Sequence, residues 1–239
     1  MILSEKCLIR IRRDRLSMSY SLNNKTYDNL KKDIMTLALM PGEPVSAAKI
    51  AERYDVSRTP AREALVKLET ESLVDIYPQV GSEISRIDED RAKQEWFVRR
   101  TLEMGVIDGL FEHVTGDDIL KMRDYCHKME LVAGKLSDPD MTFEYLRCDN
   151  EFHAVTYHVA GQEVAATLVA NSMAHYNRIR LLIDIESTNK DRTLATHEKL
   201  IQCIEKNDKE GYRTLLGKHI GYFEQDIVDL KARKPEMFK

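Results

Sequence analysis

Three short helical patterns followed by two short alternating segments occupy residues 27–85, and this order permits few folds. Apolar residues recur every three or four positions from Tyr27 to Leu37, which predicts one buried face of a helix. Met40-Pro41-Gly42 ends that helix, because proline lacks an N–H and glycine permits a chain reversal. Ser46 has the side chain of an N-cap, and it predicts a second helix that runs to about Tyr54.

The third helix and the segments after it complete the pattern. After a turn at Asp55-Val56-Ser57, a helix is expected to begin near Thr59-Pro60, with proline at its first position. Residues 73–77 and 82–85 alternate around Pro78-Gln79-Val80-Gly81, which predicts a two-stranded hairpin. Three short helices and a hairpin form a winged helix-turn-helix, so we assign residues 21–86 to such a domain.

The rest of the chain shows only helical patterns. Breaks are expected near Gly116, Asp138-Pro139-Asp140, Gly161, Thr188-Asn189-Lys190 and Asn207-Asp208. These divide residues 88–239 into about six helices with no strand candidate, which predicts an all-helical bundle. The fold class is therefore mainly α, with a winged helix-turn-helix joined to a helical bundle.

Composition narrows the class of protein. The chain has 36 basic and 40 acidic residues, a net charge of -4, which argues against non-specific coating of nucleic acid. Up to Ser85 there are 13 basic and 12 acidic residues, so the acidity lies in the second part of the chain. Four scattered cysteines and the lack of a long apolar run predict a cytoplasmic protein with reduced thiols and no membrane span.

The predicted third helix carries the residues for DNA recognition. The second helix of a helix-turn-helix enters the major groove by its N-terminal end, which here begins Ser57-Arg58-Thr59. Arg58 and Arg62 are one turn apart, and arginine donates two parallel hydrogen bonds to guanine. Ser57, Thr59 and the free N–H groups of the helix start favour phosphate oxygens. Two arginines on an exposed helix are often only a solvated face, but the ordered layout around them favours double-stranded DNA as the partner.

Residues 1–20 stand apart from this domain. Arg10, Arg12, Arg13 and Arg15 give the segment a basic character, and the apolar stretch before them is too short for a signal peptide. Two interpretations remain open. The segment is an arm that touches the DNA backbone, or translation begins at Met18.

Several motifs in the first domain resemble the signature of GntR-type bacterial regulators. They are Pro41-Gly42-Glu43, the run from Val56 to Leu65, and Leu68-Glu69. The resemblance implies that Arg58, Thr59 and Arg62 contact operator DNA and that Gly81 at the wing tip approaches the minor groove. Two positions depart from the pattern: Ser72 replaces a glycine that usually ends the helix, and Val80 replaces a basic residue, which weakens the expected wing contact.

A second constellation lies in the helical region. Asp149 and His153 are four residues apart, hence on one helix face, while His197 and His219 belong to two later helices. One carboxylate and three imidazoles would bind a divalent cation such as Zn, Ni or Mn. The chain has seven histidines, so the spacing by itself is also compatible with histidines that only pack or face solvent.

The region after Ile87 resembles the FCD ligand-binding domain of the FadR subfamily of GntR regulators. In that domain the metal-binding residues fall in a pattern like Asp149–His153, and two later histidines fall where His197 and His219 do. The resemblance implies a metal and a small polar effector, with residues 88–239 serving effector binding and dimerisation. Arg99 matches the Arg-x-x-Leu-Glu start of the first effector-domain helix, where it either points inward to a ligand carboxylate or forms surface ion pairs. Arg178 and Asn171 are further candidates for the effector pocket, and Arg180 and His175 share their region of the chain.

Together these patterns predict a DNA-binding transcriptional regulator, a repressor of a metabolic operon that responds to a small carboxylate metabolite. It would be a homodimer that reads a palindrome. A hydrolase is the first alternative, with Glu198 beside His197 as a base, but the chain lacks an HExxH motif and a nucleophile–base pair. The second is a non-specific nucleoid protein, which the net charge of -4 opposes. We therefore expect no enzymatic activity.

Overall fold

The computed structural model describes residues 25–186 and 190–239 of the chain. The chain divides into two compact units between Ser85 and Arg86, and each is considered by itself. The expected arm at residues 1–20 lies outside the described residues, as does most of the expected break near Thr188.

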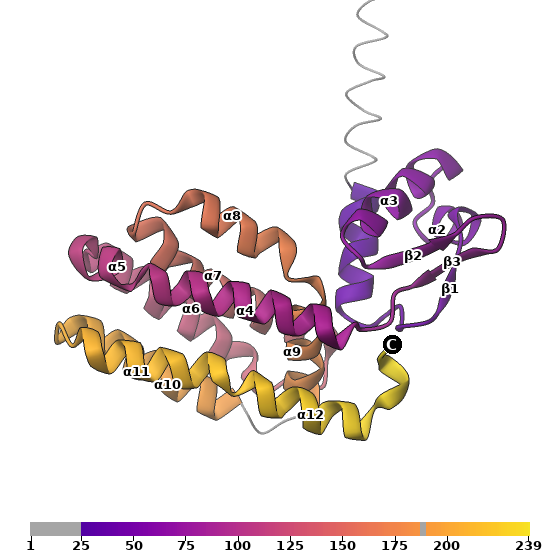
Figure 1. The fold of residues 1–239 in the computed structure, drawn as a ribbon. Helices are drawn as coiled ribbons and strands as arrows, with labels where there is room; N and C mark the ends of the chain where they lie inside the picture. The colour runs from indigo at the N-terminus through magenta and orange to yellow at the C-terminus, as the bar shows by residue number, and fades with distance from the viewer. Residues whose placement is uncertain (1–24, 187–189) are drawn as a thin grey trace, which may run out of the picture. The chain divides into compact units, whose positions relative to one another are not determined.

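The helices of the first unit occur where the apolar periodicity and caps predict them (Figure 1). Residues 25–35 are helical, and Leu30 and Ile34 are fully buried. Helix α2 spans Ala47–Arg53, and the Ser46 hydroxyl accepts a hydrogen bond from the Lys49 amide at 3.2 Å. Helix α3 spans Arg58–Thr70.

Helix α3 begins slightly earlier than predicted. Arg58 is its first residue, so Pro60 occupies the third position rather than the first. The first turn tolerates this shift, because its N–H groups have no acceptor within the helix.

A small antiparallel sheet completes the unit, and it has one strand more than predicted. Strands β2 (Val74–Tyr77) and β3 (Gly81–Ile84) form the expected hairpin. Strand β1, Pro44–Val45, pairs with the other edge of β3 and gives the order β1-β3-β2. Two residues are too few to show alternation, so the sequence pattern alone does not reveal β1.

Ser72 ends α3 in a left-handed conformation, with φ at 59°. Its amide donates to the Glu69 carbonyl at 2.9 Å, and the next amide, of Leu73, donates to the Leu68 carbonyl at 3.0 Å. A residue with a Cβ is strained at such a φ, whereas glycine is not, which is the physical reason for expecting glycine at this helix end.

Replacing Ser72 by glycine is expected to raise the free energy of unfolding by about 0.5–1 kcal/mol, because glycine adopts this φ without strain. Urea unfolding of the full chain measures the change. Ser57→Gly serves as the control, since Ser57 has an extended backbone with φ at -75° and should gain nothing. Equal effects of the two substitutions would contradict the assignment of strain to Ser72.

The second unit is helical throughout the described residues except for an isolated bridge between Ile87 and Phe238. Three of the six expected helices are each divided, at Val106, Met173 and Tyr222, which gives nine α-helices in the part of this unit that the structure describes. They are α4 (Glu89–Gly105), α5 (Ile107–His113), α6 (Gly116–Ala133), α7 (Pro139–Val159), α8 (Glu163–Ser172), α9 (Ala174–Glu186), α10 (Lys190–Glu205), α11 (Lys209–Gly221) and α12 (Phe223–Arg233), followed by a 3-10 turn at Pro235–Met237. No helix in the described part of the chain has the length and apolar character needed to cross a membrane.

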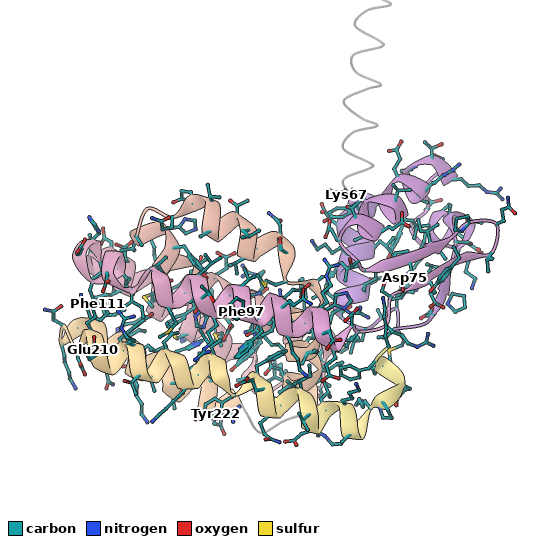
Figure 2. All side chains as sticks on the ribbon, viewed as in Figure 1. Lys67, Asp75, Phe97, Phe111, Glu210 and Tyr222 are labelled. Carbon is teal, nitrogen blue, oxygen red and sulfur yellow. The ribbon has the colours of Figure 1, made fainter. Side chains whose placement is uncertain are left out.

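Helix α7 occupies the centre of this unit and packs against α4, α5, α6, α8 and α9. Figure 1 shows α4 running between α8 on one side and α11 and α12 on the other. Its sequence explains the central position, because buried residues recur on several faces of α7, including Tyr145, Phe152 and Tyr157. The interior is filled by side chains from every helix (Figure 2).

His175, at the start of α9, is almost fully buried and has a structural role. The Asp88 amide donates to its Nδ1 at 3.1 Å, which links α9 to the first residue before α4. Burial lowers the pKa of His175 to about 3, so the ring is neutral near pH 7. His175 is also not among the residues that line the cavity beside Asp149.

The free energy of unfolding is expected to decrease as the pH is lowered below about 6.5, in part because of His175. Its folded pKa lies below the value of about 6.5 for an exposed histidine, so its contribution is complete above pH 6.5 and decreases as the pH falls toward 3. His175→Asn keeps an acceptor for the Asp88 amide but does not titrate, so it should reduce the slope of the free energy of unfolding against pH by about one proton, roughly 1.4 kcal/mol per pH unit, between about pH 6 and 4.5. His197 and His219, whose pKa values burial also lowers, retain the rest of the slope. Urea unfolding at several pH values tests this, with His158→Asn, at an exposed histidine, as the control. Identical slopes for wild type and His175→Asn would refute the assignment.

Candidate metal centre and DNA-reading helix

The first turn of α3 presents the residues predicted to contact DNA. Ser57, Arg58, Thr59 and Arg62 are all exposed. Arg58 and Arg62 lie one turn apart on the same face, and neither forms an ion pair with another described residue. Their guanidinium groups are therefore available to an external partner.

The wing tip is shaped by two residues with positive φ. Gln79 has φ at 63° and Gly81 at 149°, and no neighbouring side chain limits the space around Gly81. Val80 is 85% exposed, so the wing presents an apolar side chain at the place where a basic one would contact phosphate. Backbone approach at Gly81 remains possible, whereas a charged wing contact is absent from this position.

The structure brings Asp149, His153, His197 and His219 together in the second unit. Helix α7 supplies Asp149 and His153, α10 supplies His197, and α11 supplies His219. One ligand atom from each residue lies within 4.8 Å of the others. The first three are buried and His219 is partly exposed.

The distances within this cluster match a metal site. His197 Nε2 lies 3.3 Å from His219 Nε2 and 3.5 Å from Asp149 Oδ1. His153 Nε2 lies 3.9 Å from Asp149 Oδ2 and has no hydrogen-bond partner among the described residues. Metal–nitrogen bonds of about 2.0–2.1 Å place adjacent ligands about 3.0–3.4 Å apart, so small adjustments would let all four bind one cation.

The protonation states of the cluster also fit a metal. Burial lowers the pKa of His197 well below its usual value and that of His219 to about 3, so both rings are neutral. Burial opposes the charge of Asp149, but the guanidinium groups of Arg180 and Arg99 hold its pKa well below the usual range. A charged carboxylate and neutral imidazoles are the forms that bind metal ions.

Glu103 orients one of the candidate ligands. Its Oε2 lies 2.7 Å from His153 Nδ1, and its Oε1 accepts a hydrogen bond from Arg99 Nε at 2.5 Å. A histidine that donates from Nδ1 to a carboxylate leaves Nε2 free as the ligand atom. The sequence motif contains Glu103, but only its four-residue spacing from Arg99 signalled that both point inward.

Replacing Glu103 by glutamine is expected to lower metal affinity by about 10–100-fold, the usual effect of losing a carboxylate behind a histidine ligand. Competition with a chelating dye measures the affinity, and thermal unfolding of the same preparations shows whether the fold persists. Glu112→Gln, at an exposed site on α5, is the matched control. Unchanged affinity in a folded Glu103→Gln protein would rule out this role.

A cavity of about 70 Å³ adjoins the cluster at Asp149 and His219. Three guanidinium groups line it, from Arg99, Arg180 and Arg192. Arg99 is buried and lies 3.7 Å from Asp149, while Arg180 pairs with Asp149 directly and donates to Asn150 at 2.6 Å. Among the other lining residues, burial raises the pKa of Asp184 to about 7, which reduces the negative charge of the wall.

Two of the predicted effector residues lie elsewhere. Asn171 is exposed on α8, where its amide donates to the Thr167 carbonyl at 3.0 Å. Arg178 is fully buried on α9 and does not line the cavity. The helix break at Met173 explains the position of Asn171, because it separates this residue from the helix that carries Arg178 and Arg180. Arg178 shares α9 with Arg180 but is two residues away, on a different face of the helix.

Comparisons with known proteins agree with both units. Residues 22–84 match the bacterial regulatory proteins of the gntR family, and residues 96–222 match the FCD domain. An uncharacterised HTH-type transcriptional regulator from an unstable DNA locus of Streptomyces ambofaciens is 31% identical over 212 residues, covering 89% of this chain and 87% of that protein. The HTH-type transcriptional repressor RspR of Escherichia coli is 22% identical and covers 94% of this chain and 96% of its own length.

A solved structure has the same fold. The Escherichia coli protein McbR/YncC superposes with a TM-score of 0.68 at 20% identity, over 89% of this chain and 98% of that one. A winged helix-turn-helix and a helical FCD domain together define a DNA-binding transcriptional regulator. The chain belongs to the GntR family, with the FCD architecture of its FadR subfamily. Since the family and these relatives are regulators, the expectation that the protein is not an enzyme is confirmed.

Proposed function

We propose that this regulator represses a metabolic operon and that a small carboxylate, bound at a metal in the FCD domain, controls its affinity for the operator. The observation that carries the proposal is the position of four candidate metal ligands beside a cavity lined by three arginines. The protein would act as a cytoplasmic homodimer on a palindromic operator. Residues 57–62 and the wing at Gly81 would contact the operator DNA.

The donor set indicates which cations fit. One carboxylate and three imidazoles are ligands for Zn, Ni or Mn, and the described cysteines do not belong to the cluster. A bound cation would supply open coordination positions for an oxygen ligand. Glu103 and Arg180 hold His153 and Asp149 in place without occupying the rest of the cavity.

The arginines favour an anionic effector. A guanidinium group forms two parallel hydrogen bonds with a carboxylate, so Arg180 and Arg192 offer a second attachment point besides the metal. Arg99 also lines the cavity, but its charge is paired with Glu103 and Asp149. Arg192 lies 3.3 Å from Asp226 and stacks on the Tyr222 ring at 3.9 Å, which keeps its charge at the cavity wall. An effector of a few carbon atoms with one or two carboxylates fits these groups.

Repression and dimerisation have separate support. RspR is a repressor by name and aligns with 94% of this chain. Phe97, labelled on α4 in Figure 2, is 61% exposed and offers apolar area to a second copy. A dimer would place two α3 helices on the two halves of a palindrome.

The test combines metal content, operator binding and effector response. Elemental analysis of the pure protein identifies the cation, and selection from random DNA supplies the operator. Binding to that operator is then measured with a panel of small mono- and dicarboxylates, before and after chelation and after metal is restored. We expect one carboxylate to weaken binding at least tenfold only when metal is present. A response that persists in chelator, or no response to any carboxylate, would overturn the proposal.

A further inference from the structure

A second cavity of about 70 Å³ lies between α7 and α8, separate from the one that holds Arg180 and Arg192. Ala154 and Tyr157 of α7, Ala166 and Val169 of α8, and Met173 form most of its wall. We call this cavity the α7–α8 chamber. Arg99 and His153 also line it, so it adjoins the groups around the metal centre without containing the other three ligands.

Apart from His153, which belongs to the metal centre, Tyr157 is the residue of the chamber wall with a buried polar atom that lacks a partner among the described residues. Tyr157 is only 1% exposed, and its hydroxyl has no hydrogen-bond partner among the described residues. Its ring packs against Val106 and Ala166, a role that phenylalanine would fill equally well. A buried hydroxyl without a partner costs about 1–3 kcal/mol, so it requires an explanation. A ligand oxygen that accepts its hydrogen bond would supply one.

The charge and the size of the α7–α8 chamber limit the kind of ligand that it can hold. The charge of Arg99 is already balanced by Glu103 at 2.5 Å and Asp149 at 3.7 Å, and Glu151 lies at the chamber wall. An anion would therefore gain little there, whereas a neutral molecule avoids the cost of burying a charge. The volume of about 70 Å³ equals that of about two water molecules at roughly 30 Å³ each, so the ligand has only a few heavy atoms.

We propose that the α7–α8 chamber is a second binding site, for a small neutral molecule with a short alkyl arm and one hydroxyl or carbonyl oxygen. The alkyl arm contacts Ala166, Val169 and Met173, and the oxygen accepts a hydrogen bond from Tyr157. Burial raises the pKa of the Tyr157 phenol, which keeps it a donor at neutral pH. Neither the metal nor a carboxylate effector is required for this binding.

The test uses 1-propanol as the probe and the full chain labelled with ¹³C on its tyrosine rings. We expect a saturable shift of the Tyr157 signal, which is identified by its loss in Tyr157→Phe. Affinity should increase about three- to fourfold for each added methylene from methanol to 1-propanol and decrease again by 1-hexanol. A shift that grows linearly without saturation means that the chamber holds only water, and it would overturn the proposal.

Variants locate the probe. Ala170 lines the chamber from the exposed side of α8, so Ala170→Leu should fill it without disturbing the core and weaken 1-propanol binding at least tenfold. Tyr157→Phe, followed by calorimetry, should weaken binding about fivefold through one lost hydrogen bond. Val164→Leu, exposed on the same helix and outside the chamber wall, should leave affinity unchanged. Unchanged affinity in Ala170→Leu, or lost affinity in Val164→Leu, would place the probe elsewhere and refute the site.

Discussion

The variant His197→Ala is expected to lose stoichiometric metal binding and the response to a carboxylate, yet to bind effector-free operator within about twofold of wild type. His197 is fully buried, and its Nε2 is the atom nearest to two other ligands, at 3.3 Å from His219 and 3.5 Å from Asp149. Its removal therefore takes away the ligand with the shortest distances to the other candidate ligands. We expect metal affinity to fall at least about 100-fold, more than the loss of a residue behind a ligand causes.

The control for this variant is His158→Ala. His158 lies on α7, as His153 does, but it is exposed and lies 2.8 Å from Glu163 on the surface. Its replacement should change neither metal content nor effector response. Elemental analysis, dye competition and operator binding are measured on the same preparations. If His197→Ala retains its metal, or if both variants respond alike to the carboxylate, the four-residue centre is wrong.

Arg62→Ala is expected to lower operator affinity by about 5–150-fold, the cost of about 1–3 kcal/mol for losing one bidentate base contact. Its guanidinium is exposed on the first turns of α3 and has no ion-pair partner among the described residues. The same variant should relax base preference at one position of each half-site. It should leave the dimer and the metal content intact, because Arg62 lies in the other unit.

Lys67→Ala is the control that distinguishes a lost base contact from the loss of one positive charge on α3. Lys67 lies on the same helix five residues later, on a different face, with its ammonium 3.5 Å from the centre of the Tyr27 ring. We expect it to change operator affinity less than threefold, with the same base preference. Binding to the selected operator and to singly mutated sites, at two salt concentrations, measures both effects. Equal losses on every sequence for Arg62→Ala would show a phosphate contact rather than a base contact.

Much of the first unit could be predicted from local sequence. Ser46 caps α2 as its hydroxyl predicts, and the hairpin turns at Gly81. Strand β1 could not be predicted, because Pro44–Val45 is extended only by pairing with β3. The sequence shows that Ser72 stands where glycine is expected, and the structure adds that its φ is positive, at 59°.

The helical unit shows where local reasoning fails. The divisions at Val106 and Tyr222 each follow a single glycine, Gly105 and Gly221, which a helical pattern often tolerates. The division at Met173 has neither glycine nor proline beside it, so tertiary packing rather than propensity decides where α8 ends. The unseen break at Met173 placed Asn171 in the pocket, although it lies on the exposed side of α8. The contacts of Glu103 and Arg180 with the candidate ligands could not be predicted from local sequence, because they depend on which side chains of other helices lie beside them.

The sequence by itself determined the two-unit class and the helix expected to read DNA, because caps, periodicity and residue type are local properties. The four candidate ligands were singled out by the resemblance to the FCD domain, since spacing alone left seven histidines open. Only the tertiary structure decided that Asp149, His153, His197 and His219 meet, since their helices are separated by up to 70 positions in the chain. It also decided that Glu103 stands behind His153 and that a partnerless Tyr157 faces the α7–α8 chamber. Burial removes water from these groups. Hydrogen bonds and ion pairs between them are therefore stronger than at the surface, and a buried polar atom without a partner destabilises the fold.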